Sequence, residues 1–106
     1  MKKIIKHKFG AKPCQYDGIK FSSKLEGKYY NHLKARQKSG AVVFFLRQVP
    51  LHLPGGTKYV VDFVEFLEDG TVRFVEIKGF DTPMSKLKRT QAEAIYPIEI
   101  EVIKHC

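Results

Sequence analysis

The sequence predicts a single mixed α/β domain in which a central mixed sheet of about five strands is flanked by two helices. The chain has 106 residues, a common size for one domain. Apolar residues make up 43% of it, which is enough to build a buried core. Short runs of β-branched and aromatic residues alternate with two stretches of helical spacing. Their order is strand, helix, three strands, helix, strand.

The first half begins with residues 16–21, which alternate weakly and predict a short strand or hairpin. Ser23 is a good N-cap, and Glu26 stands three residues later, as a capping box requires. Apolar residues then recur at helical spacing, which predicts a helix over residues 23–38. Gly40 is a plausible residue to end it.

The middle of the chain predicts a strand over residues 41–46 that ends before Pro50. The glycines of residues 54–56 indicate a turn. Two further strands are expected over residues 58–66 and 72–78.

The last part of the chain holds the second helix and the last strand. Thr82 and Pro83 open the helix, because proline suits a first helical turn. We expect it to run to about Ala94 and to be followed by a strand over residues 98–103.

The loop over residues 68–70 determines which side chains share a face of the third and fourth strands. A two-residue turn would set Glu65 against Phe74, which is a poor pair. A three-residue loop with Gly70 in a left-handed bulge shifts the register by one. Apolar residues then face apolar residues, and Glu65 faces Arg73. This second register places Asp62 across from Glu76.

Strand alternation puts Lys78 on the same face as Glu76, so two carboxylates and an ammonium group are expected together. The neighbouring residues are apolar, and buried carboxylates need a compensating cation or hydrogen bonds. Hard oxygen ligands suit Mg²⁺, with Mn²⁺ as a substitute, and the carbonyl of Ile77 could add another oxygen. The alternative is a buried salt bridge to Lys78 without a metal.

Val61-Asp62 followed by Glu76-Ile77-Lys78 resembles the motif of the PD-(D/E)XK nuclease superfamily, with Val61 in place of the leading proline. The stretches 16–26 and 75–80 are more specific. Together they resemble a phage and prophage family of small nucleases, related in outline to Holliday-junction resolvases. This resemblance covers about residues 8–104.

The resemblance implies a restriction-endonuclease-like core and assigns roles to the acids. Asp62 and Glu76 would hold Mg²⁺, and Lys78 would orient the attacking water or stabilise the phosphate. Glu26 matches the acid that the first helix usually supplies, although it also has the capping role. Ser23 and four residues of the second helix are candidate DNA contacts: Lys86, Lys88, Arg89 and Gln91. The alternatives are an N-cap for Ser23 and a solvated face for the helix.

The charge of the chain agrees with a nucleic-acid partner. The net charge is +8, and such a surface attracts phosphate backbones, although acidic proteins and anionic lipids are alternatives. We divide the chain into a basic N-terminal arm (residues 1–12), which has five lysines and no acid, and a nuclease domain (residues 13–106). The arm could lie along DNA or be a solvated tail.

The location and the cysteines complete the sequence-based expectations. No run of about 18 apolar residues and no secretion signal is present, so we expect a cytoplasmic protein without membrane contact, in a host cytoplasm if phage-encoded. We expect free thiols at Cys14 and Cys106, and neither a zinc site formed with His105 nor an organic cofactor.

The expected function is that of a Mg²⁺-dependent DNA endonuclease, with a Holliday junction as the best candidate substrate. Two opposed nicks in a junction favour a two-fold symmetric homodimer. The alternatives are a nuclease for flaps, nicks or single strands, and a non-catalytic DNA-binding domain on the same fold.

Overall fold

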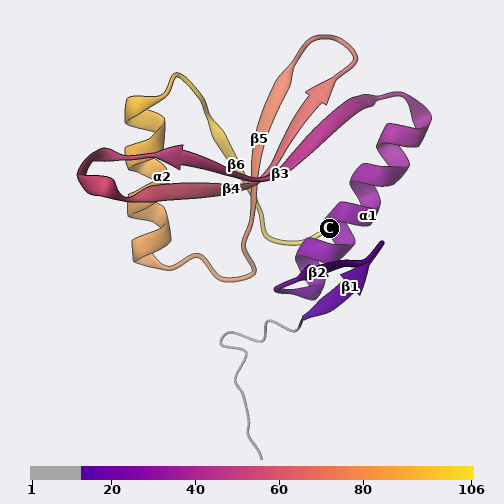
Figure 1. Ribbon diagram of the computed structural model, residues 1–106, viewed down its shortest axis with the longest axis horizontal. Helices are drawn as coiled ribbons and strands as arrows, with labels where there is room; N and C mark the ends of the chain where they lie inside the picture. Colours follow the sequence, from indigo (N-terminus) through magenta and orange to yellow (C-terminus); the bar gives the residue numbers. More distant parts are fainter. Residues whose placement is uncertain (1–12) are drawn as a thin grey trace, which may run out of the picture.

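The computed structural model describes residues 13–106, so the basic N-terminal arm lies outside the described residues (Figure 1). Within residues 13–106, two helices and two separate sheets form a mixed α+β fold. The elements in chain order are β1 (Cys14–Tyr16), β2 (Ile19–Phe21), α1 (Lys24–Ser39), β3 (Val42–His52), a short 3₁₀ turn η2 (Pro54–Gly56), β4 (Lys58–Leu67), β5 (Val72–Ile77), α2 (Pro83–Ile95) and β6 (Ile100–Ile103).

The main sheet has four strands in the order β3-β4-β5-β6, so the expectation of about five strands in one sheet was wrong. Its first two neighbouring pairs are antiparallel, and β5 and β6 are parallel. The remaining strands, β1 and β2, pair only with each other, as the hairpin alternative required. This β1–β2 hairpin packs on α1.

Helix α1 has the expected ends. The Ser23 hydroxyl accepts a hydrogen bond from the Glu26 backbone N–H, which caps the first turn. Gly40 adopts a left-handed conformation (φ 92°), and its N–H reaches the last carbonyls of the helix.

Strand β3 is much longer than predicted, because it continues through Pro50 to His52. Proline has no N–H to donate, so a central strand would lose a ladder hydrogen bond there. β3 is the outer strand of the sheet, where that loss is tolerated, and Pro50 stands opposite Val60. The sequence did not reveal that this strand would lie at an edge.

The predicted register of β4 and β5 is confirmed. Phe66 pairs with Val72, and Glu65 pairs with Arg73. Gly70 has φ 90°, and the N–H of Leu67 bonds the Thr71 carbonyl, as a three-residue loop requires.

Helix α2 begins as predicted at Pro83, with the Thr82 hydroxyl accepting from the Ser85 N–H, and ends one residue late. The last strand starts two residues later than predicted, at Ile100. Its N–H bonds the Glu93 carboxylate of α2, which joins the helix to the start of β6.

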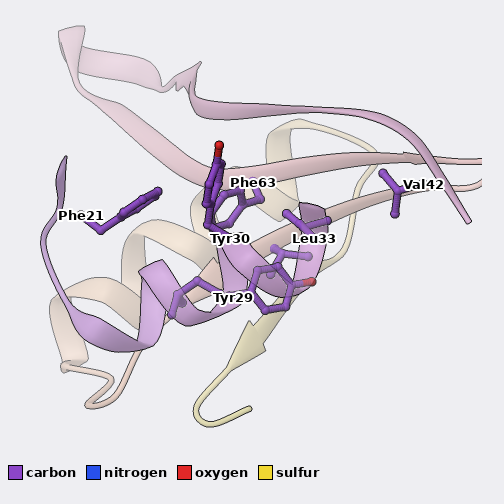
Figure 2. Close-up of a cluster of buried hydrophobic side chains, with 8 residues drawn as sticks. Phe21, Tyr29, Tyr30, Leu33, Val42 and Phe63 are labelled. Atoms are coloured by element: carbon purple, nitrogen blue, oxygen red, sulfur yellow. The ribbon is translucent and has the colours of Figure 1, made fainter. Parts of the chain in front are cut away.

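Two clusters of buried side chains hold the layers together. The first lies between α1 and the sheet and contains Tyr29, Leu33 and Phe63 (Figure 2). The second contains Ala92 of α2 and Val64. Because successive strand residues point to opposite faces, the neighbours Phe63 and Val64 join different clusters, so the helices cover opposite faces of this part of the sheet.

The β3–β4 hairpin changes its packing along its length. Phe45 and Phe63 belong to the α1 cluster, whereas Val49 and Val61 belong to the α2 cluster. In a regular strand, residues an even number apart point to the same face, so these pairs would be expected on one side of the sheet. The change occurs around Gln48, which has a left-handed backbone (φ 53°). A strand that rotates there turns its side chains from one helix toward the other.

Within residues 13–106, no helix is both long and apolar enough to span a membrane. Cys14 and Cys106 are free thiols, as expected.

Candidate active site

Glu26 enters the site from the first turn of α1 and is 6% exposed. Its backbone N–H completes half of the predicted capping box by bonding Ser23. Its carboxylate accepts hydrogen bonds from the Ser22 hydroxyl at 3.1 Å and from the Gln48 side-chain amide at 3.2 Å. Ser23 is therefore the N-cap, and the Glu26 carboxylate is directed toward β3.

Asp62 lies on β4 beside the rotation of the hairpin. One of its oxygens accepts a hydrogen bond from the Gln48 amide at 3.3 Å, and the other accepts the backbone N–H of Ile77 at 2.8 Å. The β4–β5 ladder ends at the pair Phe63–Val75. The confirmed register would set Asp62 opposite Glu76, but the ladder stops one pair short of them, and the Asp62 side chain joins the two strands there.

Glu76 and Lys78 lie at the end of β5, and Glu76 is only 3% exposed. The Lys78 ammonium lies 3.4 Å from one Glu76 oxygen, and the Arg89 guanidinium of α2 lies 3.5 Å from the other. At 3.5 Å the Arg89 contact is an ion pair, and this buried oxygen has no hydrogen-bond partner among the described residues.

All three carboxylates are held in an unfavourable environment for their charge. Burial raises the pKa of Glu26, and the Asp62 charge raises it further. Burial also raises the pKa of Asp62, despite the hydrogen bonds from Ile77 and Gln48. The pKa of Glu76 is raised by burial as well, and Lys78 and Arg89 only partly oppose this. Lys78 lowers the pKa of each of these acids, so its ammonium group acts on all of them.

The predicted metal ligands are brought near one another but not into a coordination shell. Within residues 13–106, no three His, Cys, Asp or Glu side chains are grouped so as to hold a metal ion. Glu26 and Asp62 share the Gln48 amide, whereas the Glu76 carboxylate is turned toward Lys78 and Arg89. The site therefore has two parts. The Gln48 contacts lie near α1, and the Glu76 contacts lie near α2.

The candidate DNA contacts on α2 differ in their surroundings. Lys86 and Gln91 are exposed, and Lys88 is half-buried beside Glu76 and Lys78. Arg89 is mostly buried and pairs with Asp81 at 2.5 Å, so it is already engaged. This pairing makes Arg89 a link between α2 and the end of β5.

Gln48 and Arg47 are site residues that the sequence reading missed. Gln48 bridges two of the acids, and Arg47 lowers the pKa of both while its guanidinium lies 4.8 Å from the centre of the Phe21 ring. The available signal was two adjacent polar residues between the apolar residues Leu46 and Val49. The left-handed backbone of Gln48 could not be predicted from the sequence, because glutamine rarely adopts this conformation.

One family model, described as "Protein of unknown function (DUF1064)", matches residues 6–105 of the chain. No curated protein and no solved structure matches it.

Proposed function

We propose that this chain, which belongs to the DUF1064 family, is a metal-dependent endonuclease that hydrolyses phosphodiester bonds in DNA. The observation that carries the proposal is the gathering of three carboxylates, those of the buried Glu26 and Glu76 and of the half-buried Asp62, beside Gln48 and Lys78. Burying several carboxylates costs stability, so their retention in one place indicates a chemical role.

The order of elements supports a restriction-endonuclease-like core. α1 is followed by the three strands β3, β4 and β5, then by α2 and β6. The helix supplies Glu26, and the second of these strands supplies Asp62. The third strand supplies Glu76 and is directly followed by Lys78. This is the distribution that the resemblance to PD-(D/E)XK nucleases implies.

The donors present suit a hard divalent cation such as Mg²⁺, with Mn²⁺ as a substitute. Glu26 and Asp62 are directed toward the same amide group, and one buried Glu76 oxygen has no hydrogen-bond partner among the described residues. These side chains, with the carbonyl oxygen of Ile77, would hold the cation. When bound, it would supply a deprotonated water and positive charge beside the phosphate.

The remaining residues have electrostatic and positioning roles. Lys78 would stabilise the charge that develops on the phosphate as the bond to the water oxygen forms and an ester oxygen leaves. Gln48 would keep Glu26 and Asp62 in position before the cation binds, because its amide offsets part of their mutual repulsion.

We propose branched DNA, best a four-way junction, as the substrate, cut by a two-fold symmetric homodimer in the cytoplasm. The net charge of +8 favours a phosphate backbone as partner. Two opposed nicks need two active sites, and a dimer of this small chain would supply both.

Cleavage of labelled four-way junction, duplex, flap and single-stranded DNA with Mg²⁺ tests the proposal. We expect paired symmetric nicks in the junction. Asp62→Asn should lower the rate at least about a hundredfold while DNA binding remains, because the variant loses a ligand charge. Asp69→Asn is the matched control, since Asp69 is exposed in the β4–β5 loop.

The outcomes separate the alternatives. Cleavage restricted to flaps or single strands would support the nuclease activity and would show that the proposed junction substrate is wrong. If the wild type and Asp62→Asn both bind DNA and neither cuts any substrate, the chain is a non-catalytic DNA-binding domain and the nuclease proposal is wrong.

A further inference from the structure

A cleft of about 290 Å³ opens beside Glu76 and Lys78, on the α2 side of the site. One wall is the start of β4, and the other is the first half of α2. Figure 1 shows α2 beside the outer part of the β3–β4 hairpin. The volume is at the lower end of the range for small-ligand sites, so it suits one nucleotide unit.

The cleft concentrates positive charge. It is lined by Lys58 of β4, Lys88 of α2 and Lys78, which directly follows β5, and by one acid, Glu76. The Lys78 ammonium pairs with Glu76, whereas Lys58 and Lys88 have no acidic partner among residues 13–106. Three lysines and one carboxylate leave the cleft with a net positive charge, which a bound anion would offset.

A buried hydroxyl of the same wall also lacks a partner. Tyr59 lines the cleft and is 5% exposed, and its hydroxyl has no hydrogen-bond partner among the described residues. Most buried hydroxyl groups are hydrogen-bonded, and an unsatisfied one costs about 1–3 kcal/mol. A phosphate oxygen is an acceptor of the kind that this donor lacks.

The rest of the lining consists of Ser85 and two apolar side chains, Val60 and Met84. Val60 and Met84 are 37% and 62% exposed, so apolar surface lies beside the lysines of the cleft. A nucleotide presents both kinds of surface, because its phosphate is an anion and its sugar and base have apolar faces.

We propose that this cleft binds the phosphate and sugar of the nucleotide next to the scissile phosphate, with Lys58 and Lys88 as its phosphate contacts. The inference rests on the proposed nuclease function, because it takes Glu76 and Lys78 as the place where the bond is cut. It adds Lys58, which lies on the opposite wall from α2, as a DNA contact. A DNA strand that contacts both walls of the cleft would have a fixed position relative to the acids. This position would determine which phosphodiester bond is cut.

Binding of a fluorescein-labelled oligonucleotide to the full chain in EDTA, over a series of KCl concentrations, tests the cleft without cleavage. Lys58→Ala should weaken binding about tenfold, as expected for a lost hydrogen bond to a charged group. The slope of log Kd against log salt should fall by about 0.7–0.9 for the lost phosphate contact. Lys38→Ala, at the far end of α1, removes the same charge and should leave the slope unchanged.

A second measurement locates the contact. Thymidine 3′,5′-bisphosphate added to ¹⁵N-labelled protein should shift the amide signals of Tyr59, Ser85 and Lys88, and Lys58→Ala should abolish these shifts. Lys58 is exposed, so the variant is expected to fold. Amide signals that match those of the wild type away from residue 58 would verify this.

The inference is overturned if Lys58→Ala binds DNA with the affinity and slope of the wild type, or if the bisphosphate shifts no signal of the cleft. If Lys58→Ala weakens binding and the wild type cuts nothing, the cleft is a nucleotide site and only the nuclease proposal fails. If cleavage occurs and Lys58→Ala has no effect, only the cleft proposal fails.

Discussion

The acids of the site reduce the stability of the folded chain at neutral pH. Burial raises the pKa of Glu26, Asp62 and Glu76, so the folded state binds their protons more tightly than the unfolded state does. A carboxyl group with a raised pKa favours folding below its ordinary value, and this contribution is lost as the pH rises through the raised value. Stability from these groups therefore increases as the solution is acidified from neutral pH.

Glu26→Gln should stabilise the protein near neutral pH by about 1 kcal/mol, because it removes a buried charge without removing the side chain. The gain should shrink as the pH falls toward 4.5, the ordinary pKa of this group, where wild-type Glu26 becomes neutral as well. Urea unfolding across this pH range measures the difference. Glu68→Gln, at an exposed loop position, is the control and should change little. A Glu26→Gln variant that is less stable near neutral pH would contradict this account.

At the scale of elements, Gly27 determines how closely the β1–β2 hairpin approaches α1. A Cβ atom at this position would lie 2.4 Å from the Cys14 sulfur and 2.7 Å from the Tyr16 ring. The sulfur also donates a weak hydrogen bond to the Ser23 carbonyl at 3.4 Å, so its movement has a cost. The hairpin therefore lies against the turn that carries Glu26.

Gly27→Ala should destabilise the protein by about 1 kcal/mol. Alanine gains about 1 kcal/mol in helix propensity, but the overlap with the hairpin costs about 1–3 kcal/mol. Thermal unfolding measures the net effect, and Lys28→Ala, at the next and exposed position of the same turn, is the control. An increase in melting temperature for Gly27→Ala would mean that the hairpin shifts without loss.

At the scale of the whole molecule, one buried ionic network joins the layers. Glu65 of β4 is fully buried and contacts Arg36 of α1 at 3.1 Å and Arg73 of β5 at 3.0 Å. It also accepts a hydrogen bond from the Tyr29 hydroxyl. Arg73 continues the network to Glu101 of β6. This network lies toward the β4–β5 loop, away from the proposed catalytic acids.

Glu65→Gln should destabilise the protein by about 3 kcal/mol, because it leaves two guanidinium groups without their buried carboxylate. Glu101→Gln should cost less than about 1 kcal/mol, since that carboxylate is 49% exposed. Urea denaturation of the two variants compares them directly. Equal losses would mean that the network is not the connection between α1 and the sheet.

Local signals in the sequence were sufficient for much of this architecture. Ser23 and Gly40 mark the ends of α1 because they satisfy backbone groups within a few residues. The register of β4 and β5 followed from Gly70 and from the matched pairs across the loop. The candidate acids Glu26, Asp62 and Glu76 were also identified from the sequence. In the structure Glu26 and Asp62 both bond Gln48, and Glu76 pairs with Lys78.

The sequence by itself was enough to predict the positions of the two helices and the β4–β5 register, and to select Glu26, Asp62 and Glu76 as candidate acids. These features depend on residues that are near one another along the chain. Only the tertiary structure decided that β3 is an edge strand, that Gln48 bridges Glu26 and Asp62, and that Glu76 is turned toward α2. These features depend on contacts between residues far apart in the chain. Such contacts form when α1 and α2 pack on the sheet, and the local propensities of the residues do not predict them.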